Sequence, residues 1–133
     1  MRPVYADTSY YLALFNPGDA QYPAALEFSR EDVRPIILTD FVLLEIANAL
    51  CKRNSRQVFV NLVTHLRSDP MCRIFPILKA LFEAGLRLYG DRPDKDWSLT
   101  DCISFVVMKR LRLTDALTAD RHFEQAGFRV LLK

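Results

Sequence analysis

Two aspartates each follow a short β-prone run, at the point where parallel sheets usually carry their functional groups. Asp7 comes directly after Pro3-Val-Tyr-Ala, and Asp120 comes directly after Ala116-Leu-Thr-Ala. Working sites of open α/β sheets lie outside the carboxyl ends of the strands, so both carboxylates are expected on that edge. Each aspartate could instead cap the helix expected to follow it, because Asp is a preferred N-cap residue. Taken alone, each residue leaves both interpretations open.

Two further acids lie in expected helices that are otherwise apolar. Glu45 interrupts the run Phe41-Val-Leu-Leu-Glu-Ile-Ala-Asn-Ala-Leu, so its carboxylate is expected to be buried and to need a partner. That partner could be a salt-bridging cation or a metal ion. Asp101 stands three residues after Ser98, which is the spacing of a helix capping box. The residues that follow Asp101 are apolar, however, and this draws the first helical turn toward the sheet.

Carboxylates that converge on one edge of a sheet repel one another unless they hold a divalent cation. The chain has only two histidines, and its three cysteines, Cys51, Cys72 and Cys102, form no Cys-x-x-Cys pair. Oxygen ligands without histidine or cysteine favour Mg²⁺ or Mn²⁺ over zinc. A carboxylate cage with one or two such ions is suited to phosphodiester chemistry, because the ion activates water and stabilises charge on the phosphate.

The elements that must position these acids alternate along the chain. An alternation of strands and helices predicts an α/β protein, here a three-layer α/β/α fold with a central, mostly parallel five-stranded sheet. A length of 133 residues suits one domain, 1–133. Strands are expected at 3–6, 35–38, 73–76, 116–119 and 128–132, and helices at 8–15, 19–31, 40–53, from 55 onward, at 78–89 with a stop at Gly90, at 98–110 and at 121–126.

Composition narrows the class of protein. No run of eighteen apolar residues is present, which excludes a membrane span, and Asp7 interrupts the region where a signal peptide would be apolar, so a cytoplasmic protein is expected. The net charge is +2, but with the four acids set apart 18 bases face 12 acids, a net +6. Candidates to contact phosphates are Arg53, Arg56, Arg92 and Lys95, although an ordinary solvated position is the favoured interpretation for most of the basic residues.

Four motifs together resemble a known family. Asp7-Thr-Ser, Glu45 within Thr39-Asp-Phe-Val-Leu-Leu-Glu, Ser98-Leu-Thr-Asp101 and Leu117-Thr-Ala-Asp120-Arg-His-Phe stand in the order found in PIN-domain ribonucleases. The chain most closely resembles the small VapC-type toxins of toxin–antitoxin pairs, over essentially its whole length. The resemblance implies that the strand ending before Asp120 lies beside the first strand. It also implies a catalytic and metal-binding quartet of Asp7, Glu45, Asp101 and Asp120, with supporting hydroxyls from Thr8, Ser9 or Thr100.

The same resemblance implies a function. The expected activity is Mg²⁺- or Mn²⁺-dependent hydrolysis of RNA that leaves a 5′-phosphate and a 3′-hydroxyl. The expected partners are an RNA substrate, a cognate antitoxin and a second copy of the chain, and no membrane. A housekeeping RNA-processing nuclease and a non-catalytic PIN-fold module that binds RNA or protein are the alternatives. Other phosphate chemistries lack their motifs, since there is no Gly-x-x-x-x-Gly-Lys loop and Ser9 replaces the second Asp of a dehalogenase-like phosphatase.

Three residues near the acids and one on the opposite edge of the sheet are expected to lie outside the quartet. Asp96 could be an auxiliary metal ligand, but a place in a solvated charge run is favoured. Trp97 could stack on a base, although a lone tryptophan is more often a core anchor. His122 is expected to be a packing or surface residue rather than a general base. Asp115 belongs to the turn that enters the fourth strand, on the opposite edge, and is excluded from the site.

Overall fold

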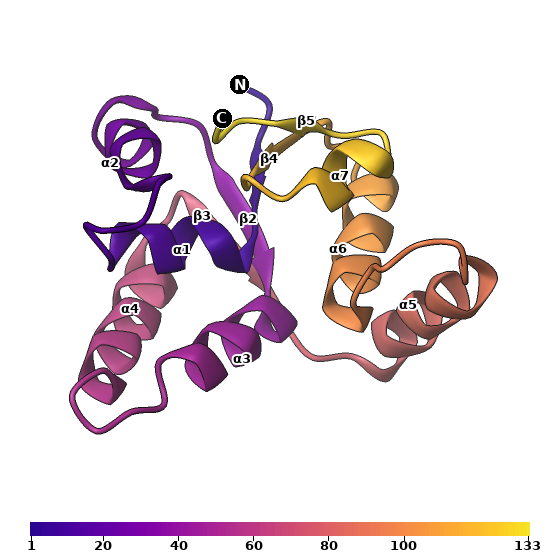
Figure 1. Ribbon diagram of the computed structural model, residues 1–133, viewed down its shortest axis with the longest axis horizontal. Coiled ribbons are helices and arrows are strands. Elements are labelled where there is room, and N and C mark those ends of the chain that lie inside the picture. The colour runs from indigo at the N-terminus through magenta and orange to yellow at the C-terminus, as the bar shows by residue number, and fades with distance from the viewer.

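Five parallel strands form one sheet through the middle of the protein, in a computed structural model that describes residues 1–133 (Figure 1). The order across the sheet is β3-β2-β1-β4-β5, and all four pairs of neighbours are parallel. The all-parallel sheet confirms the predicted fold class. The strands are β1 (Val4–Ala6), β2 (Ile36–Thr39), β3 (Cys72–Phe75), β4 (Asp115–Leu117) and β5 (Arg129–Val130).

The order of the strands reverses at β1. The chain adds β2 and β3 on one side of β1 and later adds β4 and β5 on the other. Tyr5 pairs with Ala116 and Ala6 with Leu117, so β1 and β4 end at the same height on the same edge. Ligands of open α/β sheets bind where the strand order reverses, outside the carboxyl ends of the strands. The segments after Ala6 and Leu117 therefore occupy the expected place for a site.

Helices cover both faces of the sheet, which gives three layers. Figure 1 shows α1 to α4 on one side of the sheet and α5 to α7 on the other. None of these helices is long and apolar enough to cross a membrane. Their bounds are α1 (Thr8–Leu14), α2 (Tyr22–Glu31), α3 (Asp40–Ala49), α4 (Arg56–Ser68), α5 (Lys79–Asp91), α6 (Leu99–Arg110) and α7 (Arg121–Gln125).

Helix α6 is the most deeply buried helix and fixes one side of the site. Its first turns run from Asp101 to Phe105 without an exposed residue. The hydroxyl of Ser104 is 2.7 Å from that of Tyr5 on β1, which ties α6 to the central strand. On its other side, Ile103 lies directly against Gly85 of α5, where a Cβ atom would overlap the isoleucine side chain. The start of α6, and with it Asp101, is thus held between the sheet and α5.

Several predicted bounds are wrong, each for a local reason. Helix α2 begins at Tyr22 rather than at residue 19, because the Asp19 carboxylate accepts a hydrogen bond from the Gln21 amide and forms a turn. Helix α3 ends at Ala49 rather than at Arg53, and residues 51–54 are all exposed, so no apolar contact extends it. Helix α5 continues through Gly90 to Asp91, since helices tolerate a single glycine.

The last two strands are also shorter than predicted. Strand β4 ends at Leu117 rather than at residue 119, and β5 spans only Arg129–Val130. Beyond Leu117 the chain leaves the sheet. The hydroxyl of Thr118 there accepts a hydrogen bond from the backbone N–H of Asp120, with an N–O distance of 3.0 Å. This turn brings the Thr118 and Asp120 side chains to the edge where β1 also ends.

Candidate active site

Asp7 lies at the end of β1 and is 5% exposed. It occupies the N-cap position of α1, but its side chain makes no capping hydrogen bond, so the helix-cap interpretation is wrong for this residue. Its Oδ2 instead accepts hydrogen bonds from the hydroxyls of Thr118 at 2.9 Å and Ser9 at 3.3 Å. Burial, and after it the negative charge of Asp101, raises the pKa of Asp7 to about 7, against the lowering effect of the Thr118 hydrogen bond.

Asp101 does form the predicted capping box at the start of α6. Its backbone N–H donates to the Ser98 hydroxyl at 3.0 Å, and its Oδ2 accepts from the Ser98 N–H at 3.2 Å. Burial raises the pKa of Asp101, the Ser98 amide lowers it, and the charges of Asp120 and Glu45 raise it further. The capping role therefore coexists with a place among the other acids, because a carboxylate can serve several partners at once.

Asp120 caps α7 and turns its carboxylate toward Asp101. Its Oδ1 accepts a hydrogen bond from the His122 N–H at 2.9 Å. The same Oδ1 is 3.3 Å from His122 Nδ1, and Asp101 Oδ2 is 3.4 Å from that nitrogen. One potential ligand atom from each of these three residues lies within 4.8 Å of the others. This group of potential metal ligands contains a histidine that was predicted to be a packing or surface residue, and it does not include Asp7 or Glu45.

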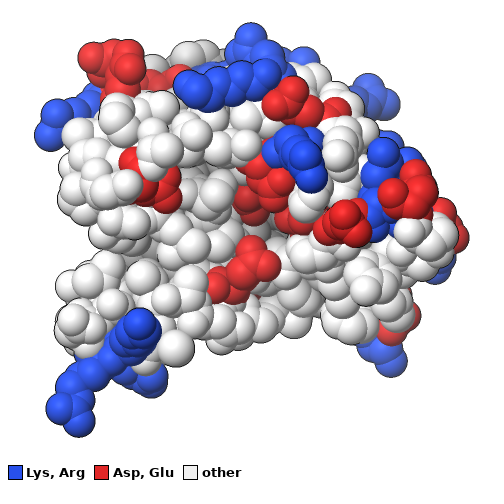
Figure 2. All heavy atoms as spheres, viewed as in Figure 1, with Lys and Arg blue, Asp and Glu red and all other residues white.

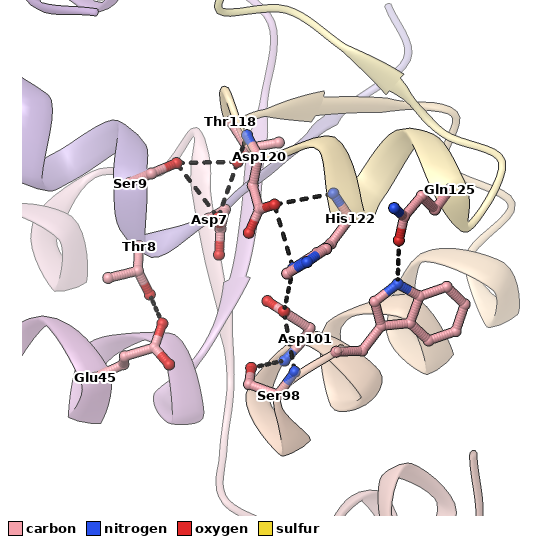
Figure 3. Close-up of polar contacts among 11 residues, drawn as sticks. Asp7, Thr8, Ser9, Glu45, Ser98, Asp101, Thr118, Asp120, His122 and Gln125 are labelled. Atoms are coloured by element: carbon pink, nitrogen blue, oxygen red, sulfur yellow. Dashed lines mark hydrogen bonds and ion pairs between the residues drawn. The ribbon is translucent and has the colours of Figure 1, made fainter. Parts of the chain in front are cut away.

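Glu45 is only partly buried, which corrects the expectation of a fully buried carboxylate. One face of α3 packs inward through Val42, Leu43 and Ile46, and Glu45 lies at the margin of that face. No Lys or Arg forms an ion pair with Glu45, so the salt-bridge alternative is wrong. Its carboxylate accepts a hydrogen bond of 2.5 Å from the Thr8 hydroxyl. Figure 3 shows Glu45 across from Asp7 and Asp101, and its charge adds a smaller contribution to the raised pKa of each.

The acids line one hollow of the surface. Figure 3 shows Asp7, Asp101 and Asp120 near one another with Glu45 across from them, and Figure 2 shows acidic atoms around a central hollow, with basic atoms beside them as well as at the rim. None of the four acids has a Lys or Arg within ion-pair distance. The chain thus concentrates negative charge, raises carboxylate pKa values and supplies no cation from its arginines or lysines. This donor set fits a divalent metal ion that binds oxygen ligands.

The expected hydroxyl groups divide into two kinds. Thr8 and Ser9 contact acids, as predicted, whereas the Thr100 hydroxyl makes no hydrogen bond to any of them. Thr118, which was not predicted to belong to the site, is fully buried and links Asp7, Ser9 and the Asp120 backbone. A local signal for it exists, because a threonine hydroxyl can hold the backbone N–H two residues later in a turn, as Thr118 does with Asp120. The hydroxyls of Thr118 and Ser9 hold the Asp7 carboxylate in one orientation.

The charged loop between α5 and α6 stays apart from the cluster. Asp96 is exposed and makes no hydrogen bond, in agreement with the solvated interpretation. Arg92 pairs with Asp94 at 3.0 Å, and its guanidinium carbon lies 5.0 Å from the centre of the Trp97 ring. The indole N–H of Trp97 donates to Gln125 at 3.0 Å and its ring packs on the aromatic core, so Trp97 is the core anchor that its rarity suggests.

Two further predictions concern residues outside the hollow. Asp115 accepts hydrogen bonds from Arg34 at 2.8 Å and Arg129 at 3.0 Å at the start of β4, which confirms its exclusion from the site. Arg53 and Arg56 are exposed at the connection between α3 and α4, and Arg56 donates to the Cys51 carbonyl. A role for these arginines in RNA contact stays a prediction.

Known proteins of the same kind are found by sequence and by structure. The model of the PIN domain family matches residues 4–129. The 23S rRNA-specific endonuclease VapC20 of Mycobacterium tuberculosis is 26% identical over 125 residues, which cover 94% of this chain and 95% of that protein. Its crystal structure, described as a sarcin–ricin loop cleaving toxin, superposes with a TM-score of 0.84 at 25% identity over 94% of this chain and 95% of that one.

A second solved structure is more distant. FitAcB from Neisseria gonorrhoeae aligns with a TM-score of 0.66 at 17% identity over 96% of each chain, which shows a shared fold. The family match spans both strands and helices that hold the acids, from β1 to the start of β5. The chain therefore belongs to the PIN-domain family, of which it is a VapC-type member.

Proposed function

We propose that this protein is a divalent-metal-dependent ribonuclease that hydrolyses phosphodiester bonds and acts as the toxin of a type II toxin–antitoxin pair. One observation carries the proposal. Asp7 and Asp101 are buried beside Asp120 at the carboxyl ends of the central strands, and no Lys or Arg neutralises them. Such a site binds an ion that the chain itself does not provide.

The four acids would hold Mg²⁺ or Mn²⁺, as one or two ions. Asp7, Asp101 and Asp120 are the proposed ligands, and Glu45 would orient water or a second ion from its position on α3. A bound ion would lower the pKa of water and stabilise charge on the phosphate. The chain itself keeps the ligands preorganised, since every one of the four carboxylates accepts a hydrogen bond from a neighbouring hydroxyl or amide. Fixed ligands reduce the reorganisation needed for reaction.

The proposed substrate class rests on the relatives. VapC20 is named for its action on 23S rRNA, and it covers nearly the whole of this chain. An RNA substrate is therefore proposed here, with Arg53, Arg56, Arg92 and Lys95 as candidate phosphate contacts outside the acidic hollow. A toxin is favoured over a housekeeping nuclease because VapC20 is described as a toxin. A partner antitoxin and a cytoplasmic site of action follow from that assignment.

Two structural proposals accompany this function. We propose that residues 1–133 form a single PIN domain, in line with the family match over 4–129. We also propose a homodimer, because Phe82, Leu86 and Tyr89, which are three and four residues apart on α5, are between 40% and 51% exposed. Large apolar side chains grouped on helices are typical of subunit contacts. Sedimentation of the purified protein over a range of concentrations tests the dimer.

The decisive experiment is RNA cleavage under control of the ion. The purified protein is incubated with 23S rRNA fragments and with unrelated RNA in EDTA, and then with added Mg²⁺ or Mn²⁺. Cleavage is expected only with the ion, with a 5′-phosphate on the products. Asp101→Asn is expected to be inactive, whereas Asp115→Asn, a matched change on the opposite edge of the sheet, keeps activity. Full cleavage in EDTA would refute metal dependence, and RNA binding without cleavage would favour the non-catalytic module.

A further inference from the structure

The site contains a histidine, His122, that has no role in the proposed quartet of acids. His122 Nδ1 is shielded from solvent and has no hydrogen-bond partner. The side chain as a whole is 22% exposed, so its accessible surface lies on other atoms of the ring. A buried nitrogen without a partner normally destabilises a protein, and its persistence calls for an explanation.

The neighbours of this nitrogen are two carboxylate oxygens. Asp120 Oδ1 is 3.3 Å away and Asp101 Oδ2 is 3.4 Å away. Both distances are short enough for a hydrogen bond. Neither contact is a hydrogen bond, because the ring nitrogen does not point at either oxygen. An imidazolium ion that served as a salt bridge would point its N–H at one of these oxygens. A nitrogen that donates to neither of the two carboxylates beside it can instead bind, together with them, a cation that lies among the three atoms.

The distances from the His122 nitrogen to the two carboxylates agree with such a cation. Adjacent ligands of a six-coordinate Mg²⁺ or Mn²⁺ ion lie about 3 Å apart, because each metal–ligand distance is about 2.1 Å. The His122 nitrogen meets both carboxylates at separations close to this value. The backbone N–H of His122 also donates to Asp120, which anchors the residue beside its carboxylate.

We propose that His122 is a nitrogen ligand of the metal ion, next to Asp101 and Asp120. This inference rests on the proposed function, since it concerns the same ion, but it changes the expected selectivity. Imidazole nitrogen binds transition metals well and Mg²⁺ poorly, whereas carboxylates serve both. The site therefore prefers Mn²⁺ over Mg²⁺, and His122 is the residue that produces the preference.

The test measures the nitrogen directly on the Mn²⁺-loaded protein. Pulsed electron paramagnetic resonance detects the nuclear spin of nitrogen bound to Mn²⁺, and the chain has only two histidines to contribute one. A coupling typical of directly bound ¹⁴N is expected in the unlabelled protein, and it is expected to change to the ¹⁵N pattern after incorporation of ¹⁵N-histidine. This comparison needs no substitution, so it does not depend on a variant that folds.

Affinity measurements on variants give the second readout. His122→Asn offers an oxygen near the position of Nδ1, so Mn²⁺ affinity should fall on the order of tenfold while Mg²⁺ affinity changes little. His65→Asn, at the exposed histidine of α4, is the matched control and should change neither affinity. Calorimetric titration with each ion measures both, and the nitrogen coupling should vanish only in His122→Asn.

Each outcome separates this inference from the proposed function. RNA cleavage that depends on the ion, without any nitrogen coupling to bound Mn²⁺, would overturn the role of His122 and leave the nuclease intact. Equal loss of Mg²⁺ and Mn²⁺ affinity in His122→Asn would also overturn it, since the histidine would then only position the carboxylates. Absence of bound Mn²⁺ in the parent protein would overturn the role of His122, whereas only the absence of both Mn²⁺ and Mg²⁺ binding would also refute the proposed function.

Discussion

Replacement of Asp7 by asparagine should stabilise the metal-free protein near neutral pH. The side chain is 5% exposed, and the ionised form lies beside the charge of Asp101. Asparagine has the same shape and keeps an oxygen that can accept the hydrogen bond from Thr118. The substitution therefore removes a buried charge while it preserves the local packing.

The size of the effect follows from the pKa. A rise in the pKa of Asp7 from 3.8 to about 7 means that ionisation destabilises the folded state by about 4 kcal/mol. The folded protein holds this proton more tightly than the unfolded chain. The stability that protonated Asp7 contributes is therefore fully present below pH 3.8 and is lost as the pH rises to about 7. At about pH 8, the free energy of unfolding of Asp7→Asn should exceed that of the parent protein by about 2 to 4 kcal/mol. Near pH 4 the two proteins should have the same free energy of unfolding.

Urea unfolding in EDTA at a series of pH values measures both proteins. The matched control is Asp115→Asn, which should destabilise the protein instead of stabilising it. Burial works to raise the pKa of Asp115, but the hydrogen bonds from Arg34 and Arg129 prevail and lower it. The stabilising effect of Asp115 is therefore present above its unfolded pKa and lost in acid, so its loss should destabilise the protein at neutral pH by about 1 to 2 kcal/mol. An Asp7→Asn protein less stable than the parent at neutral pH would refute the argument.

The remaining predictions concern catalysis and packing. Glu45→Gln should leave the unfolding free energy within about 1 kcal/mol, because no cation depends on this carboxylate, while RNA cleavage falls by orders of magnitude; a destabilised but fully active variant would contradict the assignment. Asp101→Asn should abolish cleavage and the stabilisation by Mg²⁺ in thermal melting, and cleavage at the parent rate would make this residue only a helix cap. Gly85→Ala should destabilise the protein by about 1 to 3 kcal/mol, because the new methyl group overlaps Ile103, and unchanged urea unfolding would refute that contact.

The identity of the acids and the class of fold could be predicted from the sequence. Asp7 directly follows β1, as its place after a β-prone run predicted, whereas Asp120 lies three residues beyond the end of β4. The capping box of Ser98 and Asp101 is equally local, since its two partners are three residues apart. The alternation of strands and helices then requires a parallel sheet covered on both faces. These features depend on neighbours in sequence, and so the sequence alone contains them.

Only the tertiary structure decides which of these groups meet. Thr118 contacts Asp7 across 111 positions because β4 pairs with β1, and no local pattern specifies that pairing. The position of Glu45 at the margin of the buried face likewise depends on how α3 packs. The contact of His122 with two carboxylates arises where α6 and α7 approach each other. Periodicity determines which side of an element is buried, whereas the order of the strands and the packing of the helices determine which side chains share the site.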